Sequence, residues 1–163
     1  MITNEVAAAD IETPAAAAPL SRMALAVLAM AGLMIALYML LHKLGVIVTL
    51  ACGAGSCDVV QASPWSVFLG IPVPAWGVAG YGAILVLSLL GLQPRFAADP
   101  RIAMLLLAAC TFAFGFTLYL SALEAFVIGA WCRWCIGSAI VATLLFLFAL
   151  PELPRLRRRS VHG

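Results

Sequence analysis

The sequence predicts an all-α integral membrane protein: a bundle of four transmembrane helices with an outward loop that carries cysteines and a short interfacial helix. Two observations predict this fold class. Of the 163 residues, 65% are hydrophobic and only 10% are charged, whereas soluble domains carry about 25% charged residues. The apolar residues also fall into four blocks, each long enough to cross a hydrocarbon core of about 30 Å as a helix. This composition excludes a soluble enzyme, and the net charge of +2 is too small to indicate nucleic-acid binding.

The blocks place the expected spans at residues 23–41, 71–92, 102–128 and 131–150. The first has no charged residue and would reach roughly 28 Å as a helix. Pro72 and Pro74 suit the first turn of the second span, because N–H groups there have no partner within the helix. Only Gly129 and Ala130 separate the last two spans, so we expect these spans to be antiparallel neighbours.

The segments outside the spans differ from them in composition. Residues 1–21 are rich in alanine, contain Pro14 and Pro19, and have no sustained apolar period, so we expect a disordered cytoplasmic tail. The membrane domain is expected over residues 22–150. Residues 151–163 are expected to form a basic cytoplasmic tail, since a basic cluster beside a span is an ordinary topology signal.

The basic residues set the expected orientation. Seven of the nine lie on one side of an even-numbered bundle: Arg22, Arg95, Arg101, Arg155, Arg157, Arg158 and Arg159. The positive-inside rule makes that side cytoplasmic, with both termini on it. The loop over residues 42–70 and the turn before Trp131 then face outward.

The cysteines gather on the outward side. Cys52 and Cys57 lie in the first outward loop, Cys132 and Cys135 lie where the fourth span begins, and Cys110 alone lies in the middle of a span. Thiols in an oxidising compartment tend to form disulfides. Four cysteines allow three pairings, and proximity favours Cys52 with Cys57 and Cys132 with Cys135.

The strongest chemical pattern is the run Trp131-Cys132-Arg133-Trp134-Cys135. Cys-x-x-Cys at a helix start places two sulfurs on one face, close enough to form an exchangeable disulfide. The helix N-terminus and the cation of Arg133 favour the thiolate, which is the nucleophile. A structural disulfide or half of a metal site would produce the same pattern. The second outward pair favours redox function, because the glycines in its loop let the backbone turn and move.

Several runs, taken together and in order, resemble one known family. They are Cys52, Cys57-Asp58-Val59-Val60, Ser63, Gly70-Ile71-Pro72-Val73-Pro74-Ala75-Trp76-Gly77 and Trp131-Cys132-Arg133-Trp134-Cys135. Over about residues 22 to 150 the chain resembles the vitamin K epoxide reductase family, in particular its bacterial homologues. Ala139 stands where the animal epoxide reductases have a tyrosine, which favours plain quinone reduction over reduction of the epoxide.

The resemblance implies a fold, a location and an activity. It implies a four-helix bundle around a quinone, ubiquinone or menaquinone, in the bacterial inner membrane, with the cysteine pairs on the periplasmic side. It also implies that the protein reoxidises a periplasmic thioredoxin-like thiol oxidase, supporting disulfide formation in secreted proteins. We expect this partner to act in trans, since the chain ends soon after the fourth span.

The resemblance also implies a role for each paired cysteine. The partner's thiolate attacks Cys52 and releases Cys57, which attacks the second pair at Cys132 and leaves Cys135 to pass two electrons to the quinone. Ser63 matches the family's loop serine, on a segment that caps the pocket. We expect residues 58–70 to be an interfacial segment, because their apolar side chains suit the membrane surface.

Glu124, Trp76 and Trp131 are further candidates for the quinone pocket. An ionisable residue in an apolar span is a functional hypothesis by default, so Glu124 is a candidate to accept or relay a proton. A solvated or hydrogen-bonded structural carboxylate is the alternative. The two tryptophans also suit membrane anchors. No metal site is expected, since His42 has no second histidine nearby.

Three other functions remain open. The scaffold could send electrons outward, although that would require a cytoplasmic cysteine donor. The four thiolates could make a metal-binding or transport protein, which predicts stoichiometric zinc or copper. The disulfides could also only staple loops, in which case Cys135→Ala would leave activity intact.

Overall fold

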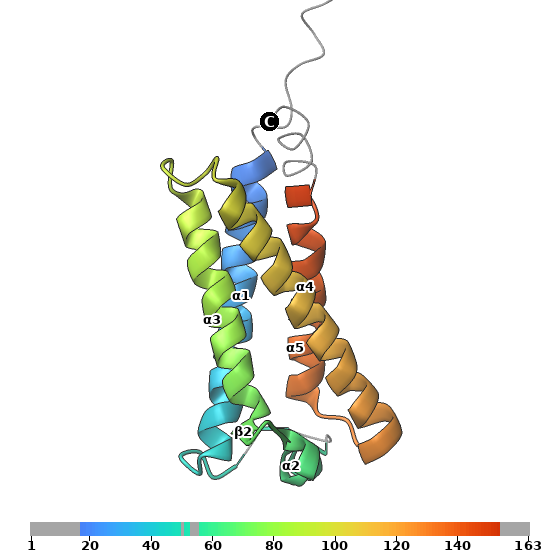
Figure 1. Ribbon diagram of the computed structural model, residues 1–163. Helices are drawn as coiled ribbons and strands as arrows, with labels where there is room; N and C mark the ends of the chain where they lie inside the picture. Colours follow the sequence, from blue (N-terminus) through green and yellow to red (C-terminus); the bar gives the residue numbers. More distant parts are fainter. Residues whose placement is uncertain (1–16, 50, 53–55, 154–163) are drawn as a thin grey trace, which may run out of the picture.

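Four long helices form the body of the protein (Figure 1). The computed structural model describes residues 17–49, 51–52 and 56–153. The helices are α1 (Ala17–Lys43), α3 (Val73–Leu92), α4 (Pro100–Leu123) and α5 (Arg133–Ala149). The end of α4 continues into η2 (Glu124–Ile128), a π-helical turn. The helical content agrees with the predicted fold class.

Three of these helices are long and apolar enough to cross a membrane. They cover Leu20–Lys43, Val73–Leu92 and Pro100–Ile128. The fourth, α5, is apolar but shorter, with 17 residues, which is the lower end of the length that spans a bilayer. The chain is therefore a membrane protein, and a fourth span at α5 stays a prediction.

The bundle closes because each long helix packs against two others. α1 contacts α3 and α5, and α4 contacts the same two helices. Leu25, Ile84, Leu106 and Leu145, one from each helix, are wholly buried at the centre. Many large apolar side chains on the outer faces are exposed, among them Val27, Val86 and Leu147. An apolar exterior of this kind suits lipid.

Two ends of the bundle can be distinguished (Figure 1). The start of α1, the connection between α3 and α4, and the end of α5 lie together at one end. The end of α1, the connection from η2 to α5 and the short elements that follow α1 lie at the other. An even number of antiparallel helices produces this arrangement. Which end faces the cytoplasm stays a prediction.

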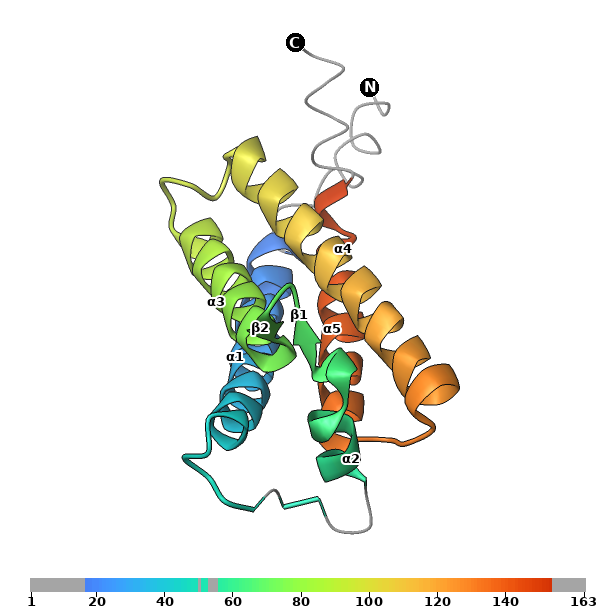
Figure 2. The ribbon, with the colours of Figure 1, turned by 60° about the horizontal axis from the view of Figure 1, so that its bottom comes forward.

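The short elements form a cap over the second end (Figure 2). The cap, residues 57–72, consists of α2 (Cys57–Ala62), η1 (Pro64–Ser66), β1 (Val67–Phe68) and β2 (Ile71–Pro72). The two strands are antiparallel. Leu69 and Gly70 between them have φ of 54° and 78°, the positive values that a tight type I′ hairpin turn requires. A short interfacial helix was expected in this region, and α2 is a short helix there, although its position at a membrane surface stays a prediction and the hairpin was not foreseen.

Several element boundaries differ from the expected ones. α1 begins at Ala17, inside the expected tail 1–21, and extends past both ends of the expected span 23–41. The early start has a local cause, because the buried Arg22 side chain is hydrogen-bonded across the bundle and holds this part of the helix. Residues 1–16 and 154–163 lie outside the described residues, so the tails expected there stay predictions.

The other three spans also shift slightly. α3 begins at Val73 rather than residue 71, because Ile71 and Pro72 are paired in the hairpin. The third span begins at Pro100, where the Asp99 carboxylate accepts a hydrogen bond from the Arg101 N–H at 2.9 Å and caps the helix. α5 begins at Arg133 rather than residue 131, because the backbone of Cys132 is extended, with φ −97° and ψ 120°.

Candidate functional site

The paired cysteines come together at the capped end of the bundle. Cys52 follows α1, Cys57 begins α2, Cys132 immediately precedes α5, and Cys135 lies in the first turn of α5. Cys52, Cys57 and Cys132 share one buried cluster, with exposed fractions of 6%, 0% and 0%. The side chain of Cys135 packs against the same cluster. Residues 80 positions apart in the chain are therefore neighbours in space.

The two pairs differ in bonding. Cys52 and Cys57 form a disulfide with a Cα–Cα distance of 6.2 Å, as their spacing favoured. Cys132 and Cys135 are free thiols, where the spacing favoured a second disulfide. A hydrogen bond joins their side chains, and this bond from Cys135 lowers the pKa of Cys132 to about 7. Cys132 lies in the connection before α5. Because its pKa is about 7, a part of the Cys132 population is thiolate near neutral pH, and the thiolate is the form that exchanges with disulfides.

The fifth cysteine is separate from both pairs. Cys110 lies in the middle of α4 and is wholly buried in the apolar core of the bundle. It packs there as a small apolar side chain. It therefore provides a matched control for substitutions of the paired cysteines.

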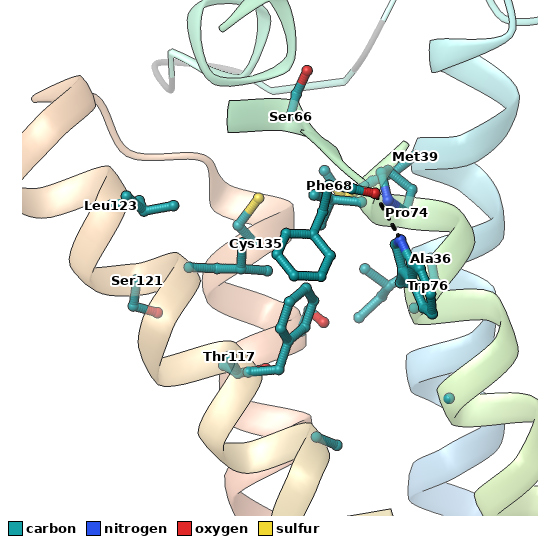
Figure 3. A pocket seen from close by; sticks show the side chains of 18 of the residues that line it. Ala36, Met39, Ser66, Phe68, Pro74, Trp76, Thr117, Ser121, Leu123 and Cys135 are labelled. Atoms are coloured by element: carbon teal, nitrogen blue, oxygen red, sulfur yellow. Dashed lines mark hydrogen bonds between the residues drawn. The ribbon is translucent and has the colours of Figure 1, made fainter. Parts of the chain in front are cut away.

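A cavity of about 560 Å³ lies between the cap and helices α1, α3 and α4 (Figure 3). Among the described cysteines, Cys135 alone lines it, and its side chain projects from α5 opposite Pro74 and Trp76 of α3. Most of the lining is apolar. Six aromatic rings contribute to it: Trp65, Phe68, Trp76, Tyr81, Phe112 and Phe116.

The aromatic rings connect the cap to two helices. The ring of Phe68, on β1, lies 6.2 Å from the Trp76 ring of α3 and 5.5 Å from the Phe116 ring of α4, both in edge-to-face geometry. Edge-to-face contacts of this kind are favourable. The cap is thus held over the cavity by rings from both sides.

Ser63 and Trp76 line this cavity, as candidate pocket residues should. Their polar groups are already bonded within the protein. The Ser63 hydroxyl donates to the carbonyl oxygen of Val60 at 2.8 Å, and the Trp76 indole N–H donates to the carbonyl oxygen of Phe68 at 3.2 Å. Both bonds fix the cap. The structure therefore places these two residues at the cavity and gives each a structural contact as well.

Glu124 connects the cavity to the cysteine pair. Its side chain is only 4% exposed and lines the cavity. One carboxylate oxygen, Oε2, accepts the backbone N–H of Cys132 at 3.2 Å, and the carboxylate also contacts the Cys135 side chain. Glu124 begins the π-helical turn, in which the Gly129 N–H bonds to its carbonyl oxygen at 3.0 Å. Such turns occur frequently at functional sites.

Trp131 lies elsewhere. It is 52% exposed and is absent from the lining of the larger cavity. It lines a second cavity, of about 300 Å³, against the α4 and α5 helices. Glu124 and Ser121 line both cavities. Trp131 is thus near the cysteine pair without bordering the space that Cys135 borders.

A model of the vitamin K epoxide reductase family matches residues 23–150. The chain belongs to this family. The match covers nearly the whole range, 22–150, over which the motifs resemble it. Membership implies an oxidoreductase, and the apolar helices and the cysteine disulfide agree with a membrane thiol oxidoreductase.

Sequence reasoning missed Lys43, which is hydrogen-bonded to the cap over the cavity. At the end of α1, its ammonium group donates to the Gln61 carbonyl oxygen and, at 2.7 Å, to the Ser66 hydroxyl. Both acceptors belong to the cap. In the sequence Lys43 marks only the end of a span, because the acceptors are identified by folding and not by spacing.

Tyr81, which lines the larger cavity, is a second residue that sequence reasoning missed. Its hydroxyl oxygen lies 2.7 Å from the Ser138 hydroxyl and donates to the Ser138 carbonyl oxygen at 3.0 Å, joining α3 to α5. Its ring lies against Gly32 of α1, where an added Cβ would be 2.5 Å from a ring carbon. Glycine is therefore required for this close approach, which no pattern in the sequence marks.

Proposed function

We propose that this family member oxidises a periplasmic thioredoxin-like thiol protein and passes its electrons, through the two cysteine pairs, to a membrane quinone, ubiquinone or menaquinone. The observation that carries the proposal is the different placement of the Cys132 and Cys135 thiols. Cys132 is buried with the Cys52–Cys57 disulfide, whereas Cys135 lines a large apolar cavity. One pair thus connects a thiol-exchange partner to a space for a lipid-soluble acceptor.

The cavity fits a quinone by size and chemistry. Small-molecule sites commonly enclose about 300–1,000 Å³ and are mostly apolar, with a few polar groups. The cavity here, about 560 Å³, has six aromatic rings together with several hydroxyls, among them those of Tyr81, Thr117 and Ser121. Rings suit contact with a flat apolar ring system, and hydroxyls can donate to carbonyl oxygens. A bound quinone would supply a two-electron acceptor, which is the capacity that oxidation of one dithiol requires.

The first proposed step is the reduction of the buried Cys52–Cys57 disulfide by the partner. The partner's thiolate is proposed to attack Cys52, which forms a mixed disulfide and releases Cys57 as a thiolate. Cys52 is 6% exposed and Cys57 is wholly buried, so the loop must open for the attack. The hydrogen bonds that would yield are those from the Ser56 N–H to the Trp131 carbonyl oxygen, 3.2 Å, and from the Ala51 N–H to the Tyr38 hydroxyl, 3.0 Å.

The second step passes the electrons to the helix pair. Cys57 attacks an oxidised Cys132–Cys135 pair at Cys132, and Cys135 leaves as the thiolate. The second partner thiol then resolves the first mixed disulfide and releases Cys52, which attacks Cys57 and restores the loop disulfide. Cys132 and Cys135 are then reduced, and this is the bonding that the structure contains. Cys135 borders the cavity, which supports it as the sulfur that reduces the acceptor.

We also propose that the protein lies in the bacterial inner membrane with the cysteine end in the periplasm and both termini in the cytoplasm. Arg22, Arg95 and Arg101 belong to the end opposite the cysteines, and Lys43 and Arg133 belong to the cysteine end. The positive-inside rule favours this orientation. The periplasm is also the compartment in which a disulfide persists.

The metal-binding alternative is less well supported. The loop disulfide leaves only two of the four thiols, Cys132 and Cys135, to act as ligands. A structural zinc site usually has four protein ligands. Across residues 17–49, 51–52 and 56–153, there is no group of three or more histidine, cysteine or acidic side chains that could hold a metal.

The experiment that tests the proposal follows quinone absorbance in detergent. The purified protein is mixed with a reduced thioredoxin-like periplasmic protein and a soluble quinone analogue, for the wild type, Cys135→Ala and the matched control Cys110→Ala. We expect reduction that depends on the partner, is lost in Cys135→Ala and persists in Cys110→Ala. Absence of reduction in the wild type with either quinone class, together with bound zinc or copper, would replace the proposal with the metal-binding alternative.

A further inference from the structure

The second cavity has no role in the steps above. It is lined by Ser121, Glu124, Trp131, Ile136, Ala139, Ile140, Thr143 and Leu144. Its one ionisable residue is Glu124, and this carboxylate also lines the larger cavity. Glu124 therefore lies between the second cavity, which α4, η2 and α5 line, and the cavity that Cys135 borders.

The surroundings of Glu124 are suited to carrying a proton. Its carboxylate accepts the Cys132 N–H at 3.2 Å and contacts the Cys135 side chain. The other titratable groups of the described residues that line either cavity are Cys135 and Tyr81, and no described lysine or arginine lines them. Within the described part of the chain, the Glu124 carboxylate forms no ion pair.

The proposed reaction also has an unmet need for protons. In thiol–disulfide exchange the attacking group is a thiolate and the leaving group is a thiolate. The partner's two protons are therefore left in water, and the electrons arrive at Cys132 and Cys135 as two thiolates. Conversion of a quinone to a hydroquinone takes two electrons and two protons. Two protons must reach a buried site from water.

We propose that Glu124 is a catalytic proton relay and that the second cavity is its connection to water. This inference rests on the proposed function. Two thiolates, one quinone and two protons become one disulfide between Cys132 and Cys135 and one hydroquinone. Each proton binds the Glu124 carboxylate from the second cavity and leaves it towards the larger one, so the carboxylate is restored after each transfer.

Variants separate this role from a structural one. Glu124→Gln keeps an oxygen that accepts the Cys132 N–H but cannot carry a proton. Asp58→Asn is the matched control, because it makes the same change on an exposed residue of the same end of the bundle. Ala139→Leu narrows the second cavity and leaves Glu124 and every cysteine in place, since Ala139 lines the second cavity and not the larger one.

The first measurement needs no quinone. Infrared difference spectra are recorded as the helix pair is cycled between disulfide and dithiol with dithiothreitol and an oxidant. We expect a protonated-carboxyl band that changes with the redox state, shifts in heavy water, persists in Asp58→Asn and is missing in Glu124→Gln. In Ala139→Leu the band should remain and exchange more slowly with heavy water. A band unchanged in Glu124→Gln would overturn the relay.

The second measurement follows quinone reduction and thiol exchange separately. We expect Glu124→Gln to lower kcat for quinone reduction about 100-fold, the usual contribution of a positioned acid or base, with the rate of electron transfer from the partner to the helix pair unchanged. Wild-type reduction with equal rates in Glu124→Gln would overturn the relay and leave the proposed function standing. No wild-type reduction would overturn the proposed function. If Glu124→Gln does not fold, the wild-type spectra and Ala139→Leu decide.

Discussion

Each end of the bundle buries a carboxylate, and the two carboxylates have different bonding partners. At the end opposite the cysteines, Glu152 is wholly buried and forms two hydrogen bonds with Arg22, at 2.9 and 3.0 Å. At the capped end, Glu124 is 4% exposed and contacts a backbone N–H and a thiol. Of the residues that the structure describes, a cation pairs with the first carboxylate and none pairs with the second.

The difference indicates that one end of the bundle is structural and that the other is the reaction site. The Arg22 guanidinium also donates to the carbonyl oxygens of Gly91, at 2.6 Å, and Ala97, at 3.0 Å. It thereby joins the start of α1, the end of α3 and the segment after α5 in one satisfied network, which suits a fixed structural joint. The capped end instead combines a cysteine disulfide, two nearby thiols, a cavity and a carboxylate that has no cation among the described residues, an arrangement that suits a reaction site.

The largest expected loss of stability would come from breaking the ion pair between Arg22 and Glu152. Arg22→Met leaves Glu152 buried without its cation, and removing one partner of a buried pair costs about 3–5 kcal/mol. We expect a large loss of thermal stability in detergent, measured by circular dichroism, and a partial recovery in the double variant Arg22→Met/Glu152→Leu. Arg101→Met, on an exposed residue, is the control. A single variant as stable as the control would show that the pair is not a structural joint.

A smaller loss of stability is expected where Gly32 packs against the Tyr81 ring. Gly32→Ala places a Cβ 2.5 Å from the Tyr81 ring, and overpacking of this kind costs about 1–3 kcal/mol. Gly115→Ala, in α4, meets nothing within 4 Å and should be neutral or slightly stabilising. Unfolding by heat would measure both. Equal stability of the two variants would mean that the Tyr81 ring moves aside without loss.

At the capped end, Lys43 tests whether the cap contributes to binding in the cavity. Lys43→Met removes two charged hydrogen bonds to the cap and should raise KM for the quinone analogue about 10-fold, equivalent to about 1.4 kcal/mol, with little change in stability. Lys43→Arg keeps the charge and should restore part of the affinity. Steady-state kinetics measures this. An unchanged KM in Lys43→Met, or a fall in stability as large as that of Arg22→Met, would contradict the assigned role.

The smallest effect is expected at Ser63. Ser63→Ala removes one hydrogen bond from the hydroxyl to the Val60 carbonyl oxygen, which is worth about 0.5–1.5 kcal/mol. We expect slightly faster proteolysis of the cap and a small rise in KM, without loss of the maximal rate. A fall in the maximal rate would instead give the hydroxyl a direct part in the reaction.

Local patterns predicted much of this molecule. The four apolar blocks correspond to α1, α3, α4 with η2, and α5, and the Cys52–Cys57 disulfide follows from spacing. The assignment to the family followed from motifs and is confirmed by the family match. Element boundaries were less accurate, because Arg22 extends α1 into the expected tail and the hairpin shortens the expected second span.

Sequence by itself determined the membrane-protein class, the helical blocks and the two cysteine pairs, because hydropathy, periodicity and short spacings are local properties of the chain. Only the tertiary structure decided that Arg22 meets Glu152, 130 residues away, that Lys43 holds the cap, and that Glu124 rather than Trp131 borders the larger cavity. These contacts depend on how four helices rotate against one another. Each helix presents its side chains around its whole circumference, so its own sequence leaves open which of them will meet a partner.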